Sequence, residues 1–276
     1  MTAARRTILV LLGFFLAGTA LAQTALPALP SAIRDAGILR VGVRCDQPPY
    51  GFQDQAGAFA GVEVEMVKQM AAWAFGDPAK AEMTCVTADT RIPQLIGRKV
   101  DLLVATLGMT AERARVVDFS KGYNWGASAI LVGKDSPVGK LDDVAGRTVV
   151  MLKGTTQAAW FDANMPNLST LRLNSVSDAL QALKQRRAEA MAGDRATLLV
   201  IAARDSSLRL LDEAYAVTEG AAAVRKGEAE WLAWVNAALA RMKADAMFQP
   251  WIERWVAAEN RASYVEAFAT PAPQAR

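Results

Sequence analysis

The chain has 276 residues, a formal net charge of +3, no histidine and two cysteines. So small a net charge excludes a nucleic-acid partner held by bulk positive charge. The absence of histidine excludes His-based catalytic triads and His metal sites, and two cysteines alone do not make a metal site. We therefore expect no metal, no cofactor and no nucleic-acid partner, and recognition by a few placed groups.

The N-terminus has the pattern of a secretion signal. Arg5 and Arg6 precede an apolar run over residues 7–17, and the small-residue sequence Ala20-Leu21-Ala22 follows. This order predicts a signal peptide over residues 1–22, cleaved between Ala22 and Gln23. A membrane anchor is the less favoured alternative, because the run is shorter than the roughly 20 residues a spanning helix needs.

Cys45 and Cys85 are the two cysteines of the predicted secreted chain. Both lie near the ends of predicted strands, and an oxidising compartment permits a bridge between them. Two buried thiols are the alternative, and the sequence does not decide between these states.

Strands and helices alternate along the chain. Buried strands are predicted at 38–43, 81–86, 100–105, 127–133, 147–152, 169–173, 188–193 and 221–227. Helices are predicted at 62–75, about 90–97, 141–146, from Thr155 to about 161, 175–187, after Asp194, and over 228–256, with an irregular tail from 270. The alternation predicts parallel sheets covered on both faces, in two βαβ series that meet near residue 128. The segments 127–133 and 215–220 are candidate crossings between the two.

Polar residues that follow the strands are the candidates for a site, because open α/β sheets bind ligands beyond the carboxyl ends of their strands. Arg113 follows the strand 100–105 across a short polar loop. A guanidinium fits a carboxylate with two parallel hydrogen bonds. The alternative is a surface arginine paired with Glu112 or Asp118.

The second series offers an anion site and a cation site. Thr155 and Thr156 open a helix after a strand and a glycine, where free N–H groups favour an anion, although simple helix capping explains the same residues. Asp194 follows an apolar strand and is suited to an ammonium group, with a helix cap near Arg195 as the alternative. Together with Arg113, these groups suggest an α-amino acid as the ligand.

The sequence resembles the periplasmic amino-acid-binding proteins of ABC importers, the family 3 solute-binding proteins. The resembling stretches are ILRVGV and YGF within 38–52, GVEVEM at 61–66, RIPQLIGRKVDLLVAT at 91–106, TAERARVVDFSKGY at 110–123, LVGKDSP, LKGTTQ, and VNAALARMKADAMFQPWIERW near the end. The resemblance implies an α/β, type II periplasmic binding protein fold with a ligand cleft between two lobes and two hinge strands. It places lobe 1 in 23–127 plus 220–276 and lobe 2 in 128–219. It also implies a periplasmic monomer that meets an inner-membrane ABC permease transiently.

The same resemblance assigns roles at the α-amino and α-carboxyl groups. In the family, the arginine of the T-x-E-R motif, here Arg113, binds the α-carboxylate with help from the threonine pair, here Thr155 and Thr156. The aspartate of the second lobe, here Asp194, binds the α-ammonium. Thr106 is retained as a hydroxyl donor, but Gly108 stands where the family has Thr or Ser, which leaves the affinity and the ligand pose open.

Two further arginines narrow the expected ligand. Family members that bind basic or amide amino acids tend to stack the ligand side chain on an aromatic residue, and this chain has Gln47 at that position. Some members have a second aromatic residue at the position of Ala88. Acidic-amino-acid binders instead resemble this chain at Arg44 and Arg91. We therefore expect glutamate or aspartate as the ligand. A neutral or amide amino acid such as glutamine is the alternative, with Arg44 and Arg91 in structural or surface roles.

An enzyme is the rival class. Some proteins that resemble this fold dehydrate small cyclic carboxylates, as cyclohexadienyl dehydratase does, and Glu219 near the second crossing is the candidate general acid. An exposed hinge glutamate is the simpler interpretation, and no catalytic residue is expected. A sensor module is a third, less favoured alternative.

Overall fold

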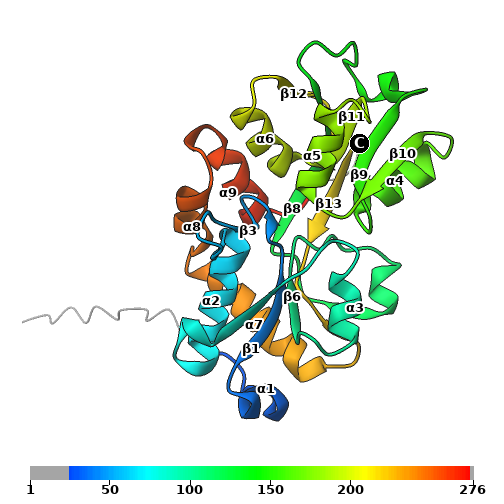
Figure 1. The fold of residues 1–276 in the computed structure, drawn as a ribbon. Coiled ribbons are helices and arrows are strands. Elements are labelled where there is room, and N and C mark those ends of the chain that lie inside the picture. The colour runs from blue at the N-terminus through cyan, green and yellow to red at the C-terminus, as the bar shows by residue number, and fades with distance from the viewer. Residues whose placement is uncertain (1–24, 274–276) are drawn as a thin grey trace, which may run out of the picture.

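A computed structural model describes residues 25–273, and the predicted signal peptide lies outside the described residues. The chain forms two lobes, each a β-sheet with helices on both faces, stacked one above the other in Figure 1. No helix within 25–273 is long and apolar enough to cross a membrane.

The sheet of the first lobe has the strand order β5-β1-β6-β14-β7. Its strands are β1 (Leu39–Val43), β5 (Ala81–Cys85), β6 (Leu102–Val104), β7 (Val117–Phe119) and β14 (Ala223–Arg225). The predicted strands near 38–43, 81–86 and 100–105 are therefore confirmed. The prediction of a wholly parallel sheet is wrong, because β14 runs antiparallel to β6 and β7. This strand enters the sheet from the side of the second lobe, so its direction is reversed.

Helices cover both faces of this sheet. On one face α2 (Val62–Phe75) packs with α7 (Ala229–Ala244), α8 (Phe248–Trp255) and α9 (Arg261–Ala269), and on the other lies α3 (Arg91–Ile96), as Figure 1 shows. The short helix α1 (Ser31–Ala36) precedes β1. Helix α2 has the predicted bounds and ends at Gly76, whose φ of 75° suits glycine.

The predicted helical segment 228–256 forms two helices, because the chain breaks between Ala244 and Phe248. Ala246 has a φ of 52°, and the backbone N–H of Met247 closes the end of α7 by donating to the carbonyl of Met242 at 3.0 Å. This left-handed turn forms on alanine, so the sequence carries no glycine or proline signal for it. The break turns α8 back toward α2.

The second sheet has the order β10-β9-β11-β8-β12, with β13 also pairing β8. Its strands are β8 (Asn124–Gly133), β9 (Thr148–Leu152), β10 (Ser169–Leu173), β11 (Ala190–Asp194), β12 (Leu208–Leu210) and β13 (Ala216–Gly220). Strands β9, β10 and β11 are parallel, whereas β8 is antiparallel to its three partners, so this sheet is also mixed. Helices α5 (Val176–Lys184) and α6 (Arg195–Arg204) cover one face, and α4 (Thr156–Asn164) covers the other.

Short 3₁₀ helices complete the outline: η1 (Pro78–Lys80), η2 (Arg113–Arg115), η3 (Leu141–Val144) and η4 (Ala258–Asn260). The predicted helix 141–146 is thus a single 3₁₀ turn, η3.

The chain crosses between the sheets at β8 and β13. The two strands pair antiparallel, with Gly126 opposite Thr218. The predicted crossing at 215–220 is therefore a strand, and both crossings lie side by side between the lobes in Figure 1. The exact residue boundaries of the lobes stay a prediction.

A small three-stranded sheet, β2 (Asp46–Gln47), β3 (Gly51–Gln53) and β4 (Phe59–Ala60), lies beside the cleft and was not predicted. It follows a disulfide between Cys45 and Cys85, whose Cα atoms are 5.4 Å apart at the ends of β1 and β5. Between the two alternatives for these cysteines, the structure therefore has the disulfide.

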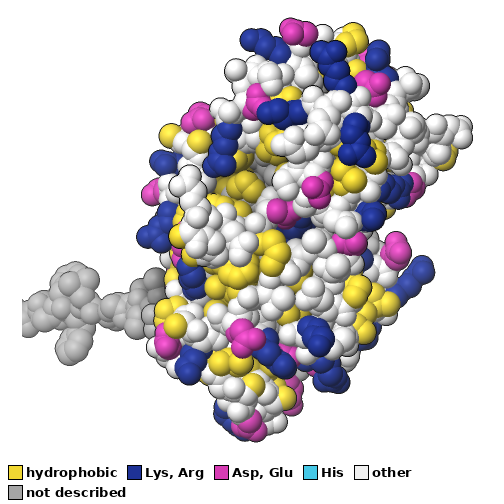
Figure 2. Space-filling view, in the orientation of Figure 1, with side chains coloured by type: hydrophobic (Ala, Val, Ile, Leu, Met, Phe, Trp, Pro, Cys, Tyr) yellow, Lys and Arg dark blue, Asp and Glu magenta, His cyan; other side chains and the backbone are white. Residues whose placement is uncertain are grey.

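The visible surface mixes both signs of charge. Figure 2 shows lysine and arginine side chains interspersed with aspartate and glutamate over both lobes. No patch of a single sign covers this face, in keeping with the small net charge.

Candidate functional site

A cavity lies between the two lobes, and every residue predicted for the site lines it. These are Arg44, Arg91, Thr106, Gly108 and Arg113 from the first lobe and Thr155, Thr156 and Asp194 from the second. They come from the carboxyl ends of β1, β6, β9 and β11 and from η2 and α3. The cavity is therefore where the open-sheet rule places a ligand.

Arg113 reaches across the cavity. Its Nη1 donates to the carbonyl of Gly108 at 2.6 Å, and its Nη2 donates to the carbonyl of Gly154, in the second lobe, at 2.8 Å. The alternative of a surface pair with Glu112 or Asp118 is wrong: among the described residues Arg113 forms no ion pair with either, and Asp118 pairs with Lys226 at 2.7 Å. Burial lowers the pKa of Arg113, so its cation lacks full solvation and favours an anion beside it.

Thr155 caps α4, as the simpler interpretation predicted. Its hydroxyl accepts from the N–H of Ala158 at 3.2 Å and donates to the carbonyl of Leu152 at 2.8 Å. Thr156, the first residue of the helix, also lines the cavity. The first N–H groups of a helix lack an intrahelical acceptor and carry the positive end of its dipole, so this end of the cavity favours an anion.

Asp194 ends β11 and caps α6. Its Oδ1 accepts from the N–H of Thr197 at 3.2 Å. Burial raises the pKa of Asp194 to about 6, and hydrogen bonds from α6 partly offset that shift. Arg195 does not neutralise it, because that side chain donates to the carbonyl of Leu211 at 3.1 Å. The carboxylate is therefore suited to a cation in the cavity.

Gly126 makes room for this carboxylate. A Cβ atom at Gly126 would lie 2.9 Å from Oδ2 of Asp194. Because Gly126 has no side chain, the backbone of the hinge strand β8 can lie close to this carboxylate.

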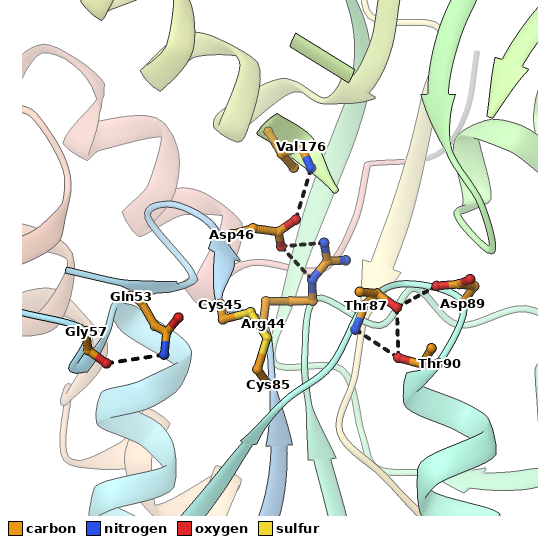
Figure 3. Close-up of a disulfide and its surroundings, with 10 residues drawn as sticks. All are labelled: Arg44, Cys45, Asp46, Gln53, Gly57, Cys85, Thr87, Asp89, Thr90 and Val176. Atoms are coloured by element: carbon orange, nitrogen blue, oxygen red, sulfur yellow. Dashed lines mark hydrogen bonds and ion pairs between the residues drawn. A yellow bond between two sulfur atoms is a disulfide. The ribbon is translucent and has the colours of Figure 1, made fainter. Parts of the chain in front are cut away.

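Arg44 lies in the cavity wall, but Asp46 already neutralises it. Its side chain is 1% exposed, and its Nη2 donates to Oδ1 of Asp46 at 2.6 Å. The other oxygen of Asp46 accepts from the N–H of Val176 in the second lobe at 3.0 Å, as drawn in Figure 3. Sequence reasoning missed Asp46, although its spacing of two from Arg44 puts both on one face of an extended chain.

Arg91 is buried, with 2% of its surface exposed. Its Nη1 donates to the carbonyls of Ala105 and Thr106 at 2.6 and 3.0 Å, so it holds the loop after β6. Burial first, and then the charges of Arg113 and Arg44, lower the pKa of Arg91. A surface role for Arg91 is therefore wrong, and its contact with a ligand side chain stays a prediction.

Glu63 is a buried carboxyl group that sequence reasoning missed. Its oxygens accept from the N–H of Thr106 at 2.8 and 3.0 Å and from the hydroxyl of Tyr123. Thr106 has a φ of 47°, and its hydroxyl donates to Oε1 of Gln47 at 2.9 Å. Burial raises the pKa of Glu63 to about 7, against the lowering effect of these bonds and of nearby arginines. The signal was available, since Met66 stands one helical turn from Glu63 on the buried face of α2.

Gly108 lies against threonine side chains of the hinge and of the second lobe. A Cβ atom there would lie 2.6 Å from Cγ2 of Thr218 and 3.0 Å from Cγ2 of Thr156. The space of a Thr or Ser side chain is thus already filled by methyl groups of the hinge and the second lobe.

The cavity wall also includes amide and hydroxyl groups that were not predicted. Gln157 donates to the hydroxyl of Ser128 at 2.9 Å, and Asn124 lies nearby on β8. Among residues 25–273 there is no cluster of acidic, cysteine or histidine side chains that could hold a metal ion.

Comparison with known proteins agrees with this geometry. The family model for bacterial extracellular solute-binding proteins, family 3, matches residues 39–258. The ABC transporter glutamine-binding protein GlnH of Bacillus subtilis (strain 168) is 30% identical over 228 residues, which cover 82% of this chain and 84% of that protein.

Solved structures are also similar to this chain. The solute receptor for L-cysteine of Neisseria gonorrhoeae has a TM-score of 0.79 at 32% identity, covering 82% of this chain and 92% of that one. An ancestral amino acid-binding protein, a precursor of cyclohexadienyl dehydratase, has a TM-score of 0.74 at 28% identity, covering 82% and 98%. The predicted two-lobe, type II fold is confirmed. The chain belongs to family 3 of the bacterial extracellular solute-binding proteins.

Proposed function

We propose that this protein captures an α-amino acid between its lobes for an ABC importer, and that the ligand side chain is uncharged and polar, as in glutamine. The observation that carries the proposal is the position of Arg113 and Asp194, on opposite lobes around one cavity. Arg113 and the start of α4 receive the α-carboxylate, and Asp194 receives the α-ammonium. The two charges of the amino acid then pair with the opposite charges of Arg113 and Asp194, and closure of the lobes buries both pairs.

The remaining wall supports an uncharged side chain. Arg44 is neutralised by Asp46, and the carboxyl group of Glu63 acts on the charge of Arg91. Gln47 and Thr106 add an amide and a hydroxyl to the same wall. An amide side chain has donors and acceptors for these groups and adds no second negative charge beside Asp46, which already pairs with Arg44. Similarity to a glutamine-binding protein supports the same ligand class.

An acidic amino acid, our expectation from the sequence, is the second candidate, and Arg91 favours it. Only Nη1 of this guanidinium bonds to protein among the described residues, while its buried Nε has no partner. Glu63, with its pKa raised to about 7, is only partly ionised at neutral pH and so compensates Arg91 incompletely. A side-chain carboxylate would supply the missing charge. The comparisons do not support this preference.

The proposal includes the route of the protein and its partner. A signal peptide over residues 1–22 would deliver the chain to the periplasm as a monomer, where the permease reads the ligand-closed shape. Binding that touches both lobes favours closure, because only the closed form makes both sets of contacts.

Binding is proposed in preference to catalysis. Glu219, the candidate general acid, lies outside the main cavity, in a small pocket on the hinge with Lys243 and Thr270. A general acid must reach its substrate within hydrogen-bonding distance. Turnover of a cyclohexadienyl acid by the pure protein would instead support the hypothesis that the protein is an enzyme.

Calorimetric titration of the purified, refolded protein with the common amino acids tests the proposal, because refolding removes ligand carried from the cell. Glutamine should bind, and two analogues should fail: glutamine with its α-carboxylate amidated, and glutaramic acid, which lacks the α-ammonium. Equal binding of either analogue would refute the roles of Arg113 or Asp194, respectively. Tight binding of glutamate with none of glutamine would favour the second candidate.

A further inference from the structure

We propose that Asp46 determines specificity in this site: it withholds the charge of Arg44 from the ligand and joins that pair to the second lobe on closure. The ligand class in this inference rests on the proposed function. Asp46 has no assigned role in the sequence pattern, and it does not line the cavity itself. It acts behind Arg44, which does.

The geometry connects three groups through one carboxylate. Oδ1 of Asp46 accepts from Nη2 and Nε of Arg44 at 2.6 and 3.2 Å. Oδ2 accepts at 3.0 Å from the N–H of Val176, which begins the nine-residue helix α5. One oxygen thus serves the first lobe and the other serves the second, as Figure 3 shows.

Both partners of Asp46 gain from its negative charge. The N–H of Val176 is one of the free donors at a helix start, where the helix dipole favours an anion. Arg44 is 1% exposed, and a buried guanidinium without a partner is unfavourable. Closure therefore places one carboxylate where two positive groups meet.

The local backbone holds this carboxylate in place. Cys45, between the two charged residues, is bonded to Cys85, and Asp46 pairs with Phe52 in the small sheet. Arg44 and Asp46 are thus fixed on both sides before a ligand arrives, which favours specificity by preorganisation.

The consequence concerns the charge of the ligand side chain. A carboxylate that reaches Arg44 must share one buried guanidinium with Asp46, and the two like charges repel. An amide at the same place meets no such repulsion. Asp46 therefore removes Arg44 as a partner for an acidic side chain, so this part of the cavity wall favours uncharged polar side chains.

Asp46→Asn tests the charge. Asparagine has a single oxygen, so closure weakens for every ligand, but Arg44 also becomes free to meet a carboxylate. The ratio of the dissociation constants of glutamate and glutamine should shift toward glutamate by about tenfold or more, the effect of one charge-assisted contact. Asp89→Asn is the matched control: Asp89 lies near the same cleft, bonds to the hydroxyl of Thr87, and does not contact Arg44.

Val176→Pro tests the bridge separately. Proline removes the N–H at the first position of a helix, where it is tolerated, and Ser175 has the extended backbone that proline requires before it (φ −122°, ψ 155°). Val176→Ala shortens the side chain but keeps the N–H. The proline variant should weaken glutamine and glutamate by the same factor, about five- to tenfold more than the alanine variant does, with their ratio unchanged.

The outcomes are distinguishable. Binding of amino acids with an unchanged ratio in Asp46→Asn would overturn the specificity role, and equal affinities of Val176→Pro and Val176→Ala would overturn the bridge. Absence of amino-acid binding by the wild-type protein would overturn the proposed function, and this inference with it.

Discussion

Arg113 in the first lobe donates a hydrogen bond of 2.8 Å from Nη2 to the carbonyl of Gly154 in the second. The side chain proposed to hold the ligand carboxylate therefore also touches the opposite lobe. If Arg113 binds the ligand carboxylate as proposed, ligand binding and lobe closure depend on one guanidinium. The predictions below test this coupling and the charges around it.

Arg113→Lys should weaken amino-acid binding by about 10- to 100-fold. Lysine keeps the charge but has no planar fork, so it loses either the carboxylate or the contacts to Gly108 and Gly154. Calorimetric titration with the best ligand measures the effect. Arg115→Lys, an exposed change in the same 3₁₀ turn, should leave the affinity unchanged. Equal affinities of both variants would contradict the role of Arg113.

Gly154→Ala should prevent full closure. The new Cβ atom would lie 2.7 Å from Cα of Asp89 and 2.8 Å from the carbonyl oxygen of Ala88, both backbone atoms of the first lobe. Gly154 also has a φ of 67°, so the variant should lose about 1–2 kcal/mol of stability through strain alone.

Gly146→Ala controls for that strain. Gly146 has a φ of 73°, but a Cβ atom there has no neighbour within 4 Å. The two variants should unfold at similar urea concentrations, while only Gly154→Ala loses affinity and stays open in small-angle scattering with ligand present. Matching affinities would show that the approach of the lobes at Gly154 is not needed for binding.

Ligand affinity should fall in mild acid because of Asp194. Its pKa is raised to about 6 by burial, and a ligand ammonium needs the ionised form. Affinity for a neutral amino acid should be level above pH 7 and should weaken by up to about tenfold per pH unit below 6, until the carboxyl group of the complex itself protonates. Titration from pH 5 to 8 measures this. Glu63→Gln should keep the fall, and a flat profile in the wild-type protein would contradict the role of Asp194.

Glu63 should give stability an unusual pH dependence. Burial raises its pKa from 4.5 to about 7, so folding favours the protonated form. That contribution is fully present below about pH 4.5 and is lost as pH rises through 7. At about 1.4 kcal/mol per pH unit, the loss is of the order of 3 kcal/mol.

Urea unfolding at pH 4.5, 6 and 8 checks this prediction in the wild type and in Glu63→Gln. The free energy of unfolding of the wild type should fall with rising pH relative to that of the variant. Asp194 titrates in both proteins, so the difference isolates Glu63. A constant difference between the two proteins across this range would contradict the prediction.

Sequence patterns predicted the parts of the fold that depend on local periodicity. Helix α2 has the apolar spacing of a buried face and a glycine stop, and its bounds were predicted at both ends. Strand β14 could not be given a direction, because its pairing with β6 and β7 depends on a return from the other lobe. The break after α7 forms on Ala246, a residue that normally continues a helix.

The same distinction, between local sequence patterns and contacts of residues far apart in the chain, applies to the site. Arg113 and Asp194 stand after predicted strand ends, so the open-sheet rule places them in the cleft. The compensation of Arg44 by Asp46 depends on a hairpin and on the start of a helix in the other lobe, which no local pattern carries. Sequence reasoning therefore counted the arginines of the wall and missed the carboxylates that face them.

The most direct test of the central claim is a calorimetric comparison of glutamine and glutamate on the refolded wild-type protein at pH 7.5. The charge pairing in the cavity predicts that glutamine binds at least about tenfold more tightly, the effect of one unpaired charge-assisted contact. Tighter binding of glutamate would contradict the account, because the arginines of the wall would then outweigh the pairing of Arg44 with Asp46.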